Sequence, residues 1–438
     1  MYDIIYIGGG LNYAGAIIAA KKGLKVALVE KDLSQLGGVC LHKGCIPSKM
    51  FLHYAQSFEQ SKSEIFEGEI NFNIQKLVEK KDRLINAATK AVHSQCKGID
   101  LIEGEGVVKE AYKVSVKDEV YEAKHIVIGT GSSPFIPEGI TYDAKRVITS
   151  DEVLELDHFP TEICIYGAGA IGLEMASFFC FSGVKVTVLL HSKGLLKKAN
   201  PLIQKALKKE LEDRGIQFLE DHKIVDTKVS AKGVAISFEN ADQIDTPMLL
   251  VASGRKPNLS VVQTDEIKVQ RGIDTDEYFQ SSLKDHYAVG DCNAKLQLAH
   301  AARAEVLNVT MSILGKSPKA LNLNHVVQFI HTLPMSYASV GQNKDMLEKS
   351  NTSYKQSQVS LREFSASSFH NAKNGLMFVY ADEEGFILGA EILAPDAEEL
   401  IAPVAMALVG EMDANLAGST IMAHPSFAEA LERSYFRL

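Results

Sequence analysis

Residues 163–172 read Ile163-Cys-Ile-Tyr-Gly167-Ala-Gly169-Ala-Ile-Gly172, an apolar run that closes on the glycine pattern G-x-G-x-x-G. A helical stretch follows, and then Gly183 precedes a second apolar run, Lys185 to Leu190. A strand, a tight glycine turn and a helix bring backbone N–H groups close to a pyrophosphate at the helix N-terminus. The stretch therefore predicts a β-α-β unit that binds a dinucleotide.

The N-terminal residues repeat this arrangement. The apolar run Asp3 to Ile7 ends at Gly8-Gly9-Gly10, and an alanine-rich helical stretch, Gly23 and the run Lys25 to Glu30 follow. Glu30 falls 20 residues after Gly10, at the end of the second predicted strand. An acidic residue at that place accepts hydrogen bonds from ribose hydroxyls. The chain therefore carries two predicted dinucleotide-binding units.

The first glycine turn departs from the pattern. Its third glycine would be residue 13, which is Tyr13, although Gly15 lies nearby. Gly23 follows Gly10 by 13 positions, whereas Gly183 follows Gly169 by 14. We therefore expect the first turn to be rebuilt and to be one residue shorter.

Two cysteines five positions apart lie in the stretch Gly37-Gly-Val-Cys40-Leu-His-Lys-Gly44-Cys45-Ile-Pro47-Ser-Lys49. An ideal helix would place residues five apart about 8 Å from each other, whereas a disulfide needs Cα atoms within about 4.4–6.8 Å. Cys40 and Cys45 can therefore bridge only where the backbone leaves an ideal helix. Gly44 and Pro47 are residue types that permit this. An arbitrary cysteine pair would be buried and inert, but these neighbours favour a reactive pair.

This stretch strongly resembles the redox-active disulfide of the class I pyridine nucleotide–disulfide oxidoreductases, and its Cys-Ile-Pro-Ser-Lys ending is most similar to dihydrolipoamide dehydrogenase. The resemblance covers nearly the whole chain, with the motifs in the family's order. It implies FAD at the first repeat and a nicotinamide coenzyme, NAD(P)(H), at the second. It also implies that Cys45 lies next to the flavin and that Cys40 exchanges with the substrate.

Other segments resemble further parts of this family. Residues 126–134 are similar to the strand and turn where the chain leaves the flavin domain, residues 287–291 and 298–300 to segments at the ribitol and beneath the ring, and residues 254–258 to the element that closes the nicotinamide domain. Lys49 and Glu174 match an ion pair beside the isoalloxazine, where a cation favours reduced flavin. The predicted FAD contacts are Gly8, Gly10, Glu30, Gly38, Lys49, Gly106, Thr130, Gly131, Asp291, Leu298, Ala299 and His300. The predicted NAD(P) contacts are Gly167, Gly169, Gly172, Glu174, Leu190, His191 and Gly254.

His424-Pro-Ser-Phe-Ala-Glu429 lies near the C-terminal end of the sequence. Thiol–disulfide exchange needs a base that makes the thiolate and an acid that protonates the leaving thiol. A carboxylate bonded to the imidazole would fix its tautomer and raise its basicity. In the resembled family this pair comes from the partner subunit, which implies a homodimer with a shared active site. The predicted catalytic residues are Cys40, Cys45, His424 and Glu429.

The resemblance implies an α/β fold with two Rossmann-like dinucleotide-binding domains and a C-terminal α+β dimerisation domain. We predict that residues 1–145 and 266–320 form a discontinuous FAD-binding domain. Residues 146–265 form the inserted NAD(P)-binding domain, and residues 321–438 form the dimerisation domain. Within the last domain, residues 397–409 read as one helix.

Composition excludes several other classes. The 438 residues carry a net charge of −9, which gives no reason to expect nucleic acid as a partner. The N-terminus has no basic leader, and no apolar run reaches the roughly 18 residues that cross a bilayer. Six scattered cysteines fit a reducing cytoplasm in which one pair is catalytic. No metal is expected.

The sequence specifies the substrate and the coenzyme less closely than it specifies the redox reaction. Dihydrolipoamide is the leading substrate, and the alternatives are another low-molecular-weight disulfide, as in glutathione reductase, or a flavin-bound redox sensor or complex subunit without turnover. Met422 stands where related enzymes often carry a second histidine, and no cysteine follows Cys292, which disfavours mercuric reductase. Leu190 and His191 stand where an NAD-selecting unit has an acid. We therefore expect NADPH to be accepted at least comparably to NADH.

Overall fold

The computed structural model describes residues 1–317 and 319–438, which fall into two compact units. Unit 1 comprises residues 1–50, 75–135 and 255–323, and unit 2 comprises residues 51–74, 136–254 and 324–438. Unit 1 is thus discontinuous in sequence, as is unit 2. Pro318, which falls in the predicted segment 266–320, lies outside the described residues.

Unit 1 is built on a seven-stranded sheet with the order β3-β2-β1-β6-β5-β4, in which β17 also pairs with β6. The strands β3, β2, β1, β6 and β17 run parallel, whereas β4 and β5 are antiparallel additions. The bounds are Tyr2–Ile7 (β1), Val26–Glu30 (β2), Asp100–Glu103 (β3), Gly106–Glu110 (β4), Lys113–Val116 (β5), Glu119–Ile128 (β6) and His286–Ala288 (β17). A separate two-stranded sheet pairs β7 (Ser132–Pro134) with β16 (Arg255–Pro257).

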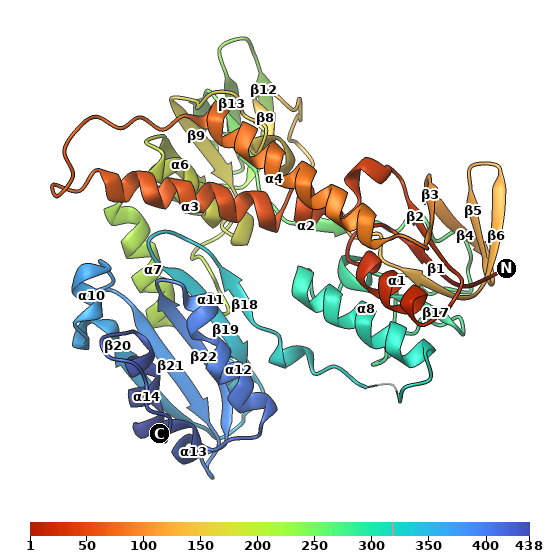
Figure 1. Cartoon of the computed structure of the whole chain (residues 1–438). Coiled ribbons are helices and arrows are strands. Elements are labelled where there is room, and N and C mark those ends of the chain that lie inside the picture. Colours follow the sequence, from red (N-terminus) through yellow and green to blue (C-terminus); the bar gives the residue numbers. More distant parts are fainter. Residues whose placement is uncertain (318) are drawn as a thin grey trace. The chain divides into compact units, whose positions relative to one another are not determined.

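Both faces of the parallel strands are buried, which explains why their sequences are apolar runs rather than alternating patterns. One face packs against helices α1 (Asn12–Lys21) and α8 (Ala299–Ile313), which lie side by side in Figure 1. The opposite face, with Ile5 and Ile7, packs against residues from β4, β5 and the segment 259–273. Helix α2 (Gly38–His42) also belongs to unit 1, whereas α3 (Cys45–Ser61) and α4 (Ile74–Gln95) have residues in both units.

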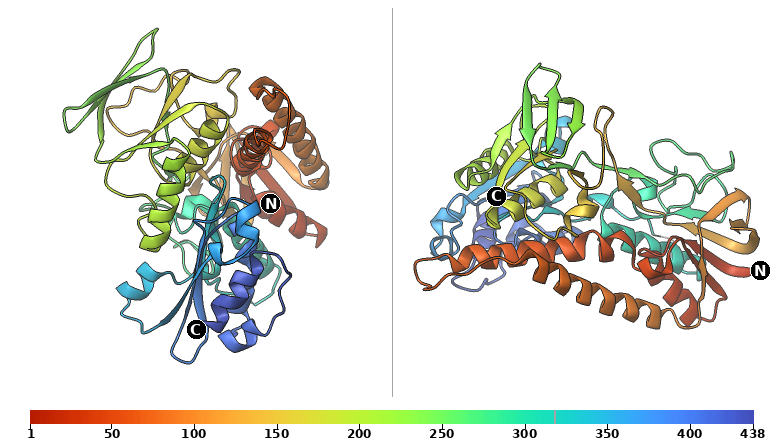
Figure 2. Two further views of the ribbon diagram at one scale, coloured as in Figure 1. Left: turned by 90° about the vertical axis from the view of Figure 1, so that its left-hand side faces the viewer. Right: turned by 90° about the horizontal axis from the view of Figure 1, so that it is seen from above.

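The first part of unit 2 repeats the parallel architecture. Its five-stranded sheet has the order β11-β10-β9-β15-β8, and the strands are all parallel. The bounds are Val147–Ile148 (β8), Glu162–Tyr166 (β9), Lys185–Leu189 (β10), Gln217–Leu219 (β11) and Leu249–Val251 (β15), with helices Ser150–Val153 (α5), Ala170–Phe181 (α6) and Pro201–Asp213 (α7). A three-stranded antiparallel sheet shares a core with it and is drawn in green in Figure 2; its strands are Ile224–Val229 (β12), Val234–Phe238 (β13) and Gln243–Thr246 (β14).

The second part of unit 2 is an antiparallel sheet with helices, in the order β18-β19-β22-β21-β20. Its strands are Gln328–Ile330 (β18), Ser336–Gly341 (β19), Lys355–Ser360 (β20), Leu376–Ala381 (β21) and Ile387–Ala394 (β22). Its helices are Lys344–Lys349 (α9), Ala366–Phe369 (α10), Ala397–Leu400 (α11), Ala402–Val409 (α12), Ala414–Gly418 (α13) and Ala428–Phe436 (α14). The single helix predicted over residues 397–409 is wrong, because it divides between α11 and α12. Pro403, which has no N–H to donate, lies in the first turn of α12.

A buried carboxylate joins the two parts of unit 2. Glu391 on β22 is fully buried and accepts hydrogen bonds from the hydroxyls of Tyr380 (2.7 Å) and Tyr337 (3.0 Å) and from the backbone N–H of Asn200 (2.7 Å). Asn200 caps helix α7 by accepting from the backbone N–H of Leu202 at 3.0 Å. A buried carboxylate is tolerated where hydrogen bonds replace its hydration, and these bonds hold the start of α7 against the antiparallel sheet.

These observations confirm the predicted fold class. Two Rossmann-like parallel sheets are present, and a glycine turn and a helix follow strand β1 in one and strand β9 in the other. The last part of the chain is an antiparallel sheet with helices. The exact boundaries of the four predicted segments remain predictions.

Candidate active site

The first glycine turn joins β1 to α1 and leaves an open space above its backbone. Gly8 has a φ of +96°, and a Cβ there would lie 2.3 Å from the carbonyl oxygen of Gly129. A Cβ on Gly10, by contrast, would meet no atom within 4 Å. Gly8 therefore permits close packing against the neighbouring strand end, while Gly10 faces space in which a phosphate group could approach the turn.

Glu30 is held at this turn by its own hydrogen bonds. One carboxylate oxygen accepts from the backbone N–H of Gly9 at 2.5 Å, and the other accepts from that of Asp32 at 3.3 Å. The half-buried side chain thus lies at the end of β2 beside the glycine turn. This is the position from which an acid reaches the ribose of a bound dinucleotide.

The prediction that the first turn is one residue shorter is wrong. Four residues separate β1 from α1, whereas three separate β9 from α6. The first unit is shorter in its helix instead, because α1 has 10 residues and α6 has 12. Asn12 supports the turn by donating from Nδ2 to the carbonyl of Ile7 at 3.0 Å. Gly15 permits contact with α8, because a Cβ there would lie 2.5 Å from Oγ1 of Thr310. Tyr13 packs at the edge of the core.

The two cysteines lie on different helices. Cys40 is within α2, and Cys45 is the first residue of α3. A Cβ on the intervening Gly44 would lie 2.9 Å from the carbonyl of Val39 and 3.3 Å from Cα of Cys40. The break at Gly44 therefore folds the start of α3 back onto α2, which is the departure from an ideal helix that the spacing requires.

The thiols of Cys40 and Cys45 are in hydrogen-bond contact. This hydrogen bond, together with burial of Cys40, raises the pKa of the Cys40 thiol far above its ordinary value. A negative charge on Cys45 acts in the same direction. Cys45, which is exposed, lies at a helix N-terminus, whose positive end favours a thiolate. The pair is therefore arranged so that Cys40 keeps its proton when Cys45 is ionised.

The α2 helix begins directly beside the glycine turn. Gly38 has a φ of +67°, and a Cβ there would lie 2.7 Å from Cα of Gly10. An L-residue is disfavoured at such a φ, and the added carbon would strike the backbone of the turn. The structure therefore places the cysteine helix next to the predicted pyrophosphate turn within unit 1, and Gly38 allows that approach.

Asp291 lies in a hydrogen-bonded group that sequence reasoning did not assemble. Its carboxylate accepts from the hydroxyl of Ser132 at 2.5 Å, and Arg255 donates to the hydroxyl of Ser132 from Nε at 2.8 Å and to its carbonyl from a terminal nitrogen at 2.6 Å. Thr130 and Asn258 are joined by reciprocal bonds of 2.7 and 3.0 Å. The turn after β6, the residues around β16 and Asp291 thus form one connected site.

The helix after Asp291 contributes its N-terminus and a buried acid. Helix α8 begins at Ala299 and has no side-chain cap at Leu298. Glu305 accepts from the backbone N–H of Gly290 at 2.7 Å and from Nδ2 of Asn293 at 2.8 Å, which holds the loop that carries Asp291. Sequence reasoning missed Glu305, because a glutamate inside a helix normally indicates a solvated face. Burial raises the pKa of this carboxyl.

These features fit FAD. The open Gly10, the acid at the end of β2, Asp291 and the uncapped start of α8 supply the contacts that a pyrophosphate, a ribose, a ribitol and a ring require. The side-chain amide oxygen of Asn12 is buried and has no protein partner in the described part of the chain. Gly106 is instead packed against side chains, since a Cβ there would lie 3.0 Å from Val29.

The second glycine turn, in unit 2, is more tightly packed. Gly167 has a φ of +119°, and a Cβ on Gly172 would lie 1.9 Å from the carbonyl of Gly167. A Cβ on Gly169, or on Gly254 after β15, would meet no atom within 4 Å. Helix α6 starts at Ala170 without a side-chain cap, so its first N–H groups can donate hydrogen bonds to a phosphate.

The strand register confirms that Leu190 is the counterpart of Glu30. Ile7 pairs with Val29, and Tyr166 pairs with Leu189, so the next residues, Glu30 and Leu190, occupy the same place in the two units. Leu190 is only 4% exposed, and its backbone N–H and carbonyl are hydrogen-bonded to Leu219 and His222 at 2.8 Å each. His191 is exposed, and Lys193 lies 3.8 Å from Asp221.

His424 and Glu429 are brought together in unit 2. Nδ1 of His424 lies 2.9 Å from a carboxylate oxygen of Glu429, whose other oxygen accepts from the backbone N–H of Ser426 at 3.0 Å. The hydrogen bond to His424, followed by that from Ser426, lowers the pKa of Glu429. The carboxylate therefore orients a ring whose other nitrogen is free to face outward, because the His424 side chain is 76% exposed.

Several large apolar side chains in the segment that precedes His424 are exposed. Ile421 is 94% exposed, and Met406, Val409 and Leu416 on α12 and α13 are also exposed. Exposed apolar side chains on consecutive helices are candidates for an interaction surface. Lys49 belongs to unit 1 and Glu174 to unit 2, so their ion pair stays a prediction. Within unit 2, Glu174 is buried and accepts from the backbone N–H of His331 at 3.0 Å.

Comparisons with known proteins agree with this geometry. The sequence model described as "Pyridine nucleotide-disulphide oxidoreductase" matches residues 2–305, and that of its dimerisation domain matches residues 327–435. The chain is 30% identical to dihydrolipoyl dehydrogenase of Bacillus subtilis, over 98% of this chain and 96% of that protein. It is 32% identical to dihydrolipoyl dehydrogenase of Chlorobaculum tepidum, over 99% and 96%.

Solved structures share the fold. LpdA from Mycobacterium tuberculosis superimposes with a TM-score of 0.92 at 21% identity, covering 100% of this chain and 99% of that one. The HOCl-induced flavoprotein disulfide reductase RclA from Escherichia coli gives 0.89 at 24% identity, covering 99% of each chain. Among the described residues, none of the helices combines the length and the apolar character that a membrane crossing requires. The chain belongs to the pyridine nucleotide-disulphide oxidoreductase family, as a homodimeric flavoprotein disulfide oxidoreductase that uses FAD and NAD(P)H.

Proposed function

We propose that this enzyme transfers electrons between NAD(P)H and a small dithiol or disulfide of the dihydrolipoamide type through Cys40 and Cys45. The contact between the two thiols beside the glycine turn of unit 1 is the observation that carries the proposal. The names of the relatives support a dihydrolipoyl substrate, because dihydrolipoyl dehydrogenases match over nearly the whole chain. FAD, when bound, supplies a two-electron relay between the nicotinamide and the cysteine pair.

The two cysteines have different tasks in this proposal. Two electrons open the Cys40–Cys45 disulfide to a Cys45 thiolate, favoured at the start of α3, and a Cys40 thiol. The raised pKa of Cys40 means that it keeps its proton at neutral pH. Cys40 must lose this proton before it can attack a substrate disulfide, since the thiolate is the nucleophile.

His424 takes the proton from Cys40 and returns it to the leaving thiol of the substrate. The Cys40 thiolate forms a mixed disulfide with one substrate sulfur, and the other substrate sulfur leaves as a thiol that carries the returned proton. Cys45 then attacks Cys40, which restores the protein disulfide and releases the second substrate thiolate. That group takes up the proton that balances the reaction, so one NAD(P)H and one H⁺ convert one disulfide into two thiols.

We further propose that His424 serves the cysteine pair of the partner subunit. The exposure of His424 and the apolar surface formed by Met406, Val409, Leu416 and Ile421 support this arrangement. A second copy covering that surface would bury these side chains and bring the imidazole to an active site. Glu429 acts as a positioning residue, because it bonds to His424 and not to the sulfurs.

The coenzyme site supports weak discrimination between NADH and NADPH. Because Leu190 stands in place of Glu30, no carboxylate ends the second strand to repel a 2′-phosphate. His191, Lys193 and Lys197 follow, and Lys197 is held by donating to the hydroxyl of Ser192 at 2.6 Å. We therefore propose that NADPH is accepted at least comparably to NADH, although the strand end has no arginine for a bidentate bond.

A substrate panel tests the proposal. The FAD-loaded enzyme is assayed with lipoamide, glutathione disulfide and coenzyme A disulfide, each with NADH and with NADPH. We expect the highest kcat/KM with lipoamide and comparable values for the two coenzymes. A preference for NADH above roughly a hundredfold would contradict the coenzyme proposal, since it corresponds to about 2.7 kcal/mol of transition-state discrimination. Activity confined to glutathione disulfide would identify that disulfide as the substrate in place of lipoamide. No turnover with any disulfide would favour a redox sensor.

A further inference from the structure

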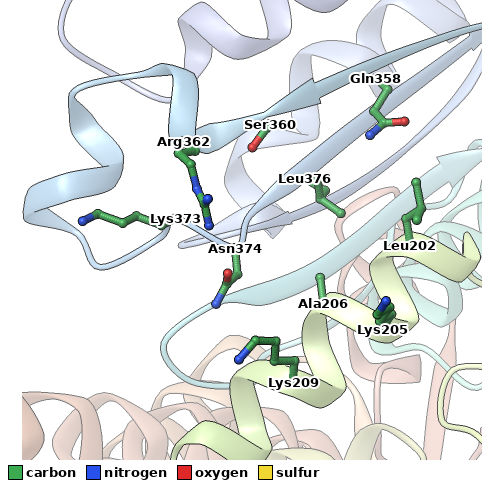
Figure 3. Close-up of a pocket in the computed structure, with 10 residues that line it drawn as sticks. All are labelled: Leu202, Lys205, Ala206, Lys209, Gln358, Ser360, Arg362, Lys373, Asn374 and Leu376. Carbon is green, nitrogen blue, oxygen red and sulfur yellow. The ribbon is translucent and has the colours of Figure 1, made fainter.

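A basic pocket lies in unit 2, away from the residues assigned to redox chemistry. It has a volume of about 350 Å³ and lies between helix α7 and the strands β20 and β21 (Figure 3). Its lining residues are Leu202, Lys205, Ala206, Lys209, Gln358, Ser360, Arg362, Lys373, Asn374 and Leu376. Pockets of this volume accept small organic ligands.

The charge of the lining is entirely positive. Lys205, Lys209, Arg362 and Lys373 line the pocket together with no aspartate or glutamate. Lys209 is paired with Asp213 at 2.6 Å. The side chains of Lys205, Arg362 and Lys373 form no ion pair within residues 1–317 and 319–438. These side chains are exposed, and no carboxylate of the lining competes with an anion for them.

Neighbouring carboxylates are already engaged elsewhere. Glu210 accepts from Nδ2 of Asn374 at 2.8 Å and lies 3.5 Å from Arg214. Glu363 is paired with Arg433 at 3.0 Å and Arg437 at 2.9 Å. These acids therefore do not neutralise the lining cations. The Asn374 amide is held by Glu210 at the edge of the pocket, where it is fixed rather than free to rotate.

The polar and apolar parts of the pocket are separated. In Figure 3, Arg362 extends toward Asn374, and Lys209 reaches toward the same region from α7. Leu202, Ala206 and Leu376 supply an apolar surface between the two sides. A guanidinium forms paired hydrogen bonds with phosphate oxygens, while apolar side chains favour a hydrocarbon body.

We propose that this pocket binds a small organic phosphate, with the dianionic phosphate at Arg362 and Lys209, which reach toward the same region in Figure 3, and an apolar body against Ala206 and Leu376. The ligand bridges α7 of the coenzyme-binding part and the antiparallel sheet. It is distinct from the coenzyme, whose predicted contacts lie at the glycine turn before α6. This inference does not depend on the identity of the disulfide substrate.

Isothermal titration calorimetry with 1-naphthyl phosphate tests this assignment. The FAD-loaded dimer is titrated at low ionic strength with saturating NADP⁺ present, so that the coenzyme site is filled. Inorganic phosphate and 1-naphthol are titrated in parallel to separate the contributions of the two ligand parts. We expect one ligand per chain, with 1-naphthyl phosphate binding more tightly than either fragment. Arg362→Ala and Lys209→Ala should each weaken binding about tenfold or more, the usual effect of losing one hydrogen bond to a charged group.

Lys232→Ala is the matched control, because Lys232 is exposed in unit 2 and does not line the pocket. We expect it to bind like the wild type, and all three variants should keep wild-type disulfide reductase activity, which shows that they fold. Added salt should weaken binding, since exposed charges are screened. The proposal is overturned if 1-naphthyl phosphate does not bind at millimolar concentration, or if Arg362→Ala and Lys209→Ala bind it as well as Lys232→Ala does.

Discussion

His424→Gln removes the proposed base but keeps a polar side chain of similar reach. His424 is 76% exposed, and its Nδ1 bonds only to the carboxylate of Glu429 among the described contacts, so the substitution should not affect folding. A positioned acid or base contributes typically 10²–10⁴-fold to a rate. We therefore expect kcat/KM for disulfide reduction at pH 7 to fall about a hundredfold or more.

The pH dependence gives the sharper signature. The bond to Cys45 and burial raise the pKa of Cys40, so its thiol is protonated at neutral pH, and the thiolate fraction increases as pH rises. Below a thiol's pKa, each pH unit increases that fraction about tenfold, and an ordinary cysteine would begin to level off near pH 8.5. Without a base, the residual activity of His424→Gln should therefore rise about tenfold per unit through pH 7–9 and should not level off there.

The assay is the oxidation of NADPH with a disulfide acceptor, measured across this pH range, with flavin absorbance as the check on cofactor content. His158→Gln is the matched control, because His158 in unit 2 has a similar exposed fraction, 77%, and also pairs with a carboxylate, that of Asp157. We expect the control to match the wild type. A loss smaller than about threefold in His424→Gln, or a flat pH profile, would refute the assignment of His424 as the base.

Three further predictions concern the dimer, the buried acid and the coenzyme turn. Mixing inactive Cys45→Ser protein with inactive His424→Ala protein should restore partial activity through hybrid dimers, as measured after subunit exchange; a fully active monomer would contradict this. Glu391→Ala leaves two tyrosine hydroxyls and two backbone N–H groups without their acceptor, so the free energy of unfolding, measured by thermal unfolding, should fall by about 3 kcal/mol or more, with a smaller fall for Glu391→Gln. Gly172→Ala adds a Cβ 1.9 Å from the carbonyl of Gly167, so KM for the coenzyme should rise while FAD content stays unchanged; an unaltered KM would show that this turn does not position the coenzyme.

The sequence was sufficient for features that depend on local spacing. Two glycine turns, each between an apolar run and a helix, predict two parallel sheets, because each pattern specifies both the turn and the strands that flank it. The Leu190 counterpart of Glu30 could be found by counting residues, and the strand register confirms it. The break between Cys40 and Cys45 was also foreseeable, since Gly44 stands where the backbone must turn, and Pro47 lies in the first turn of the helix that follows.

Features that depend on long-range contacts could not be predicted. Ser132 and Arg255 are 123 positions apart, and neither residue type indicates by itself that it orients Asp291. The buried site of Glu391 exists only because Tyr380 and Asn200 come together in the fold. The error about the first turn has a similar origin, because the side chain of Asn12 supports a longer turn at which a third glycine is not needed.

Counting electrons tests the central claim most directly. An anaerobic titration of the FAD-loaded enzyme with dithionite should consume roughly four electrons per subunit, two for the flavin and two for the Cys40–Cys45 disulfide. Cys45→Ser provides the control, because it should keep its flavin and take up roughly two electrons. A wild-type enzyme that takes up only two electrons would contradict the account, since the cysteine pair would then not be a redox centre.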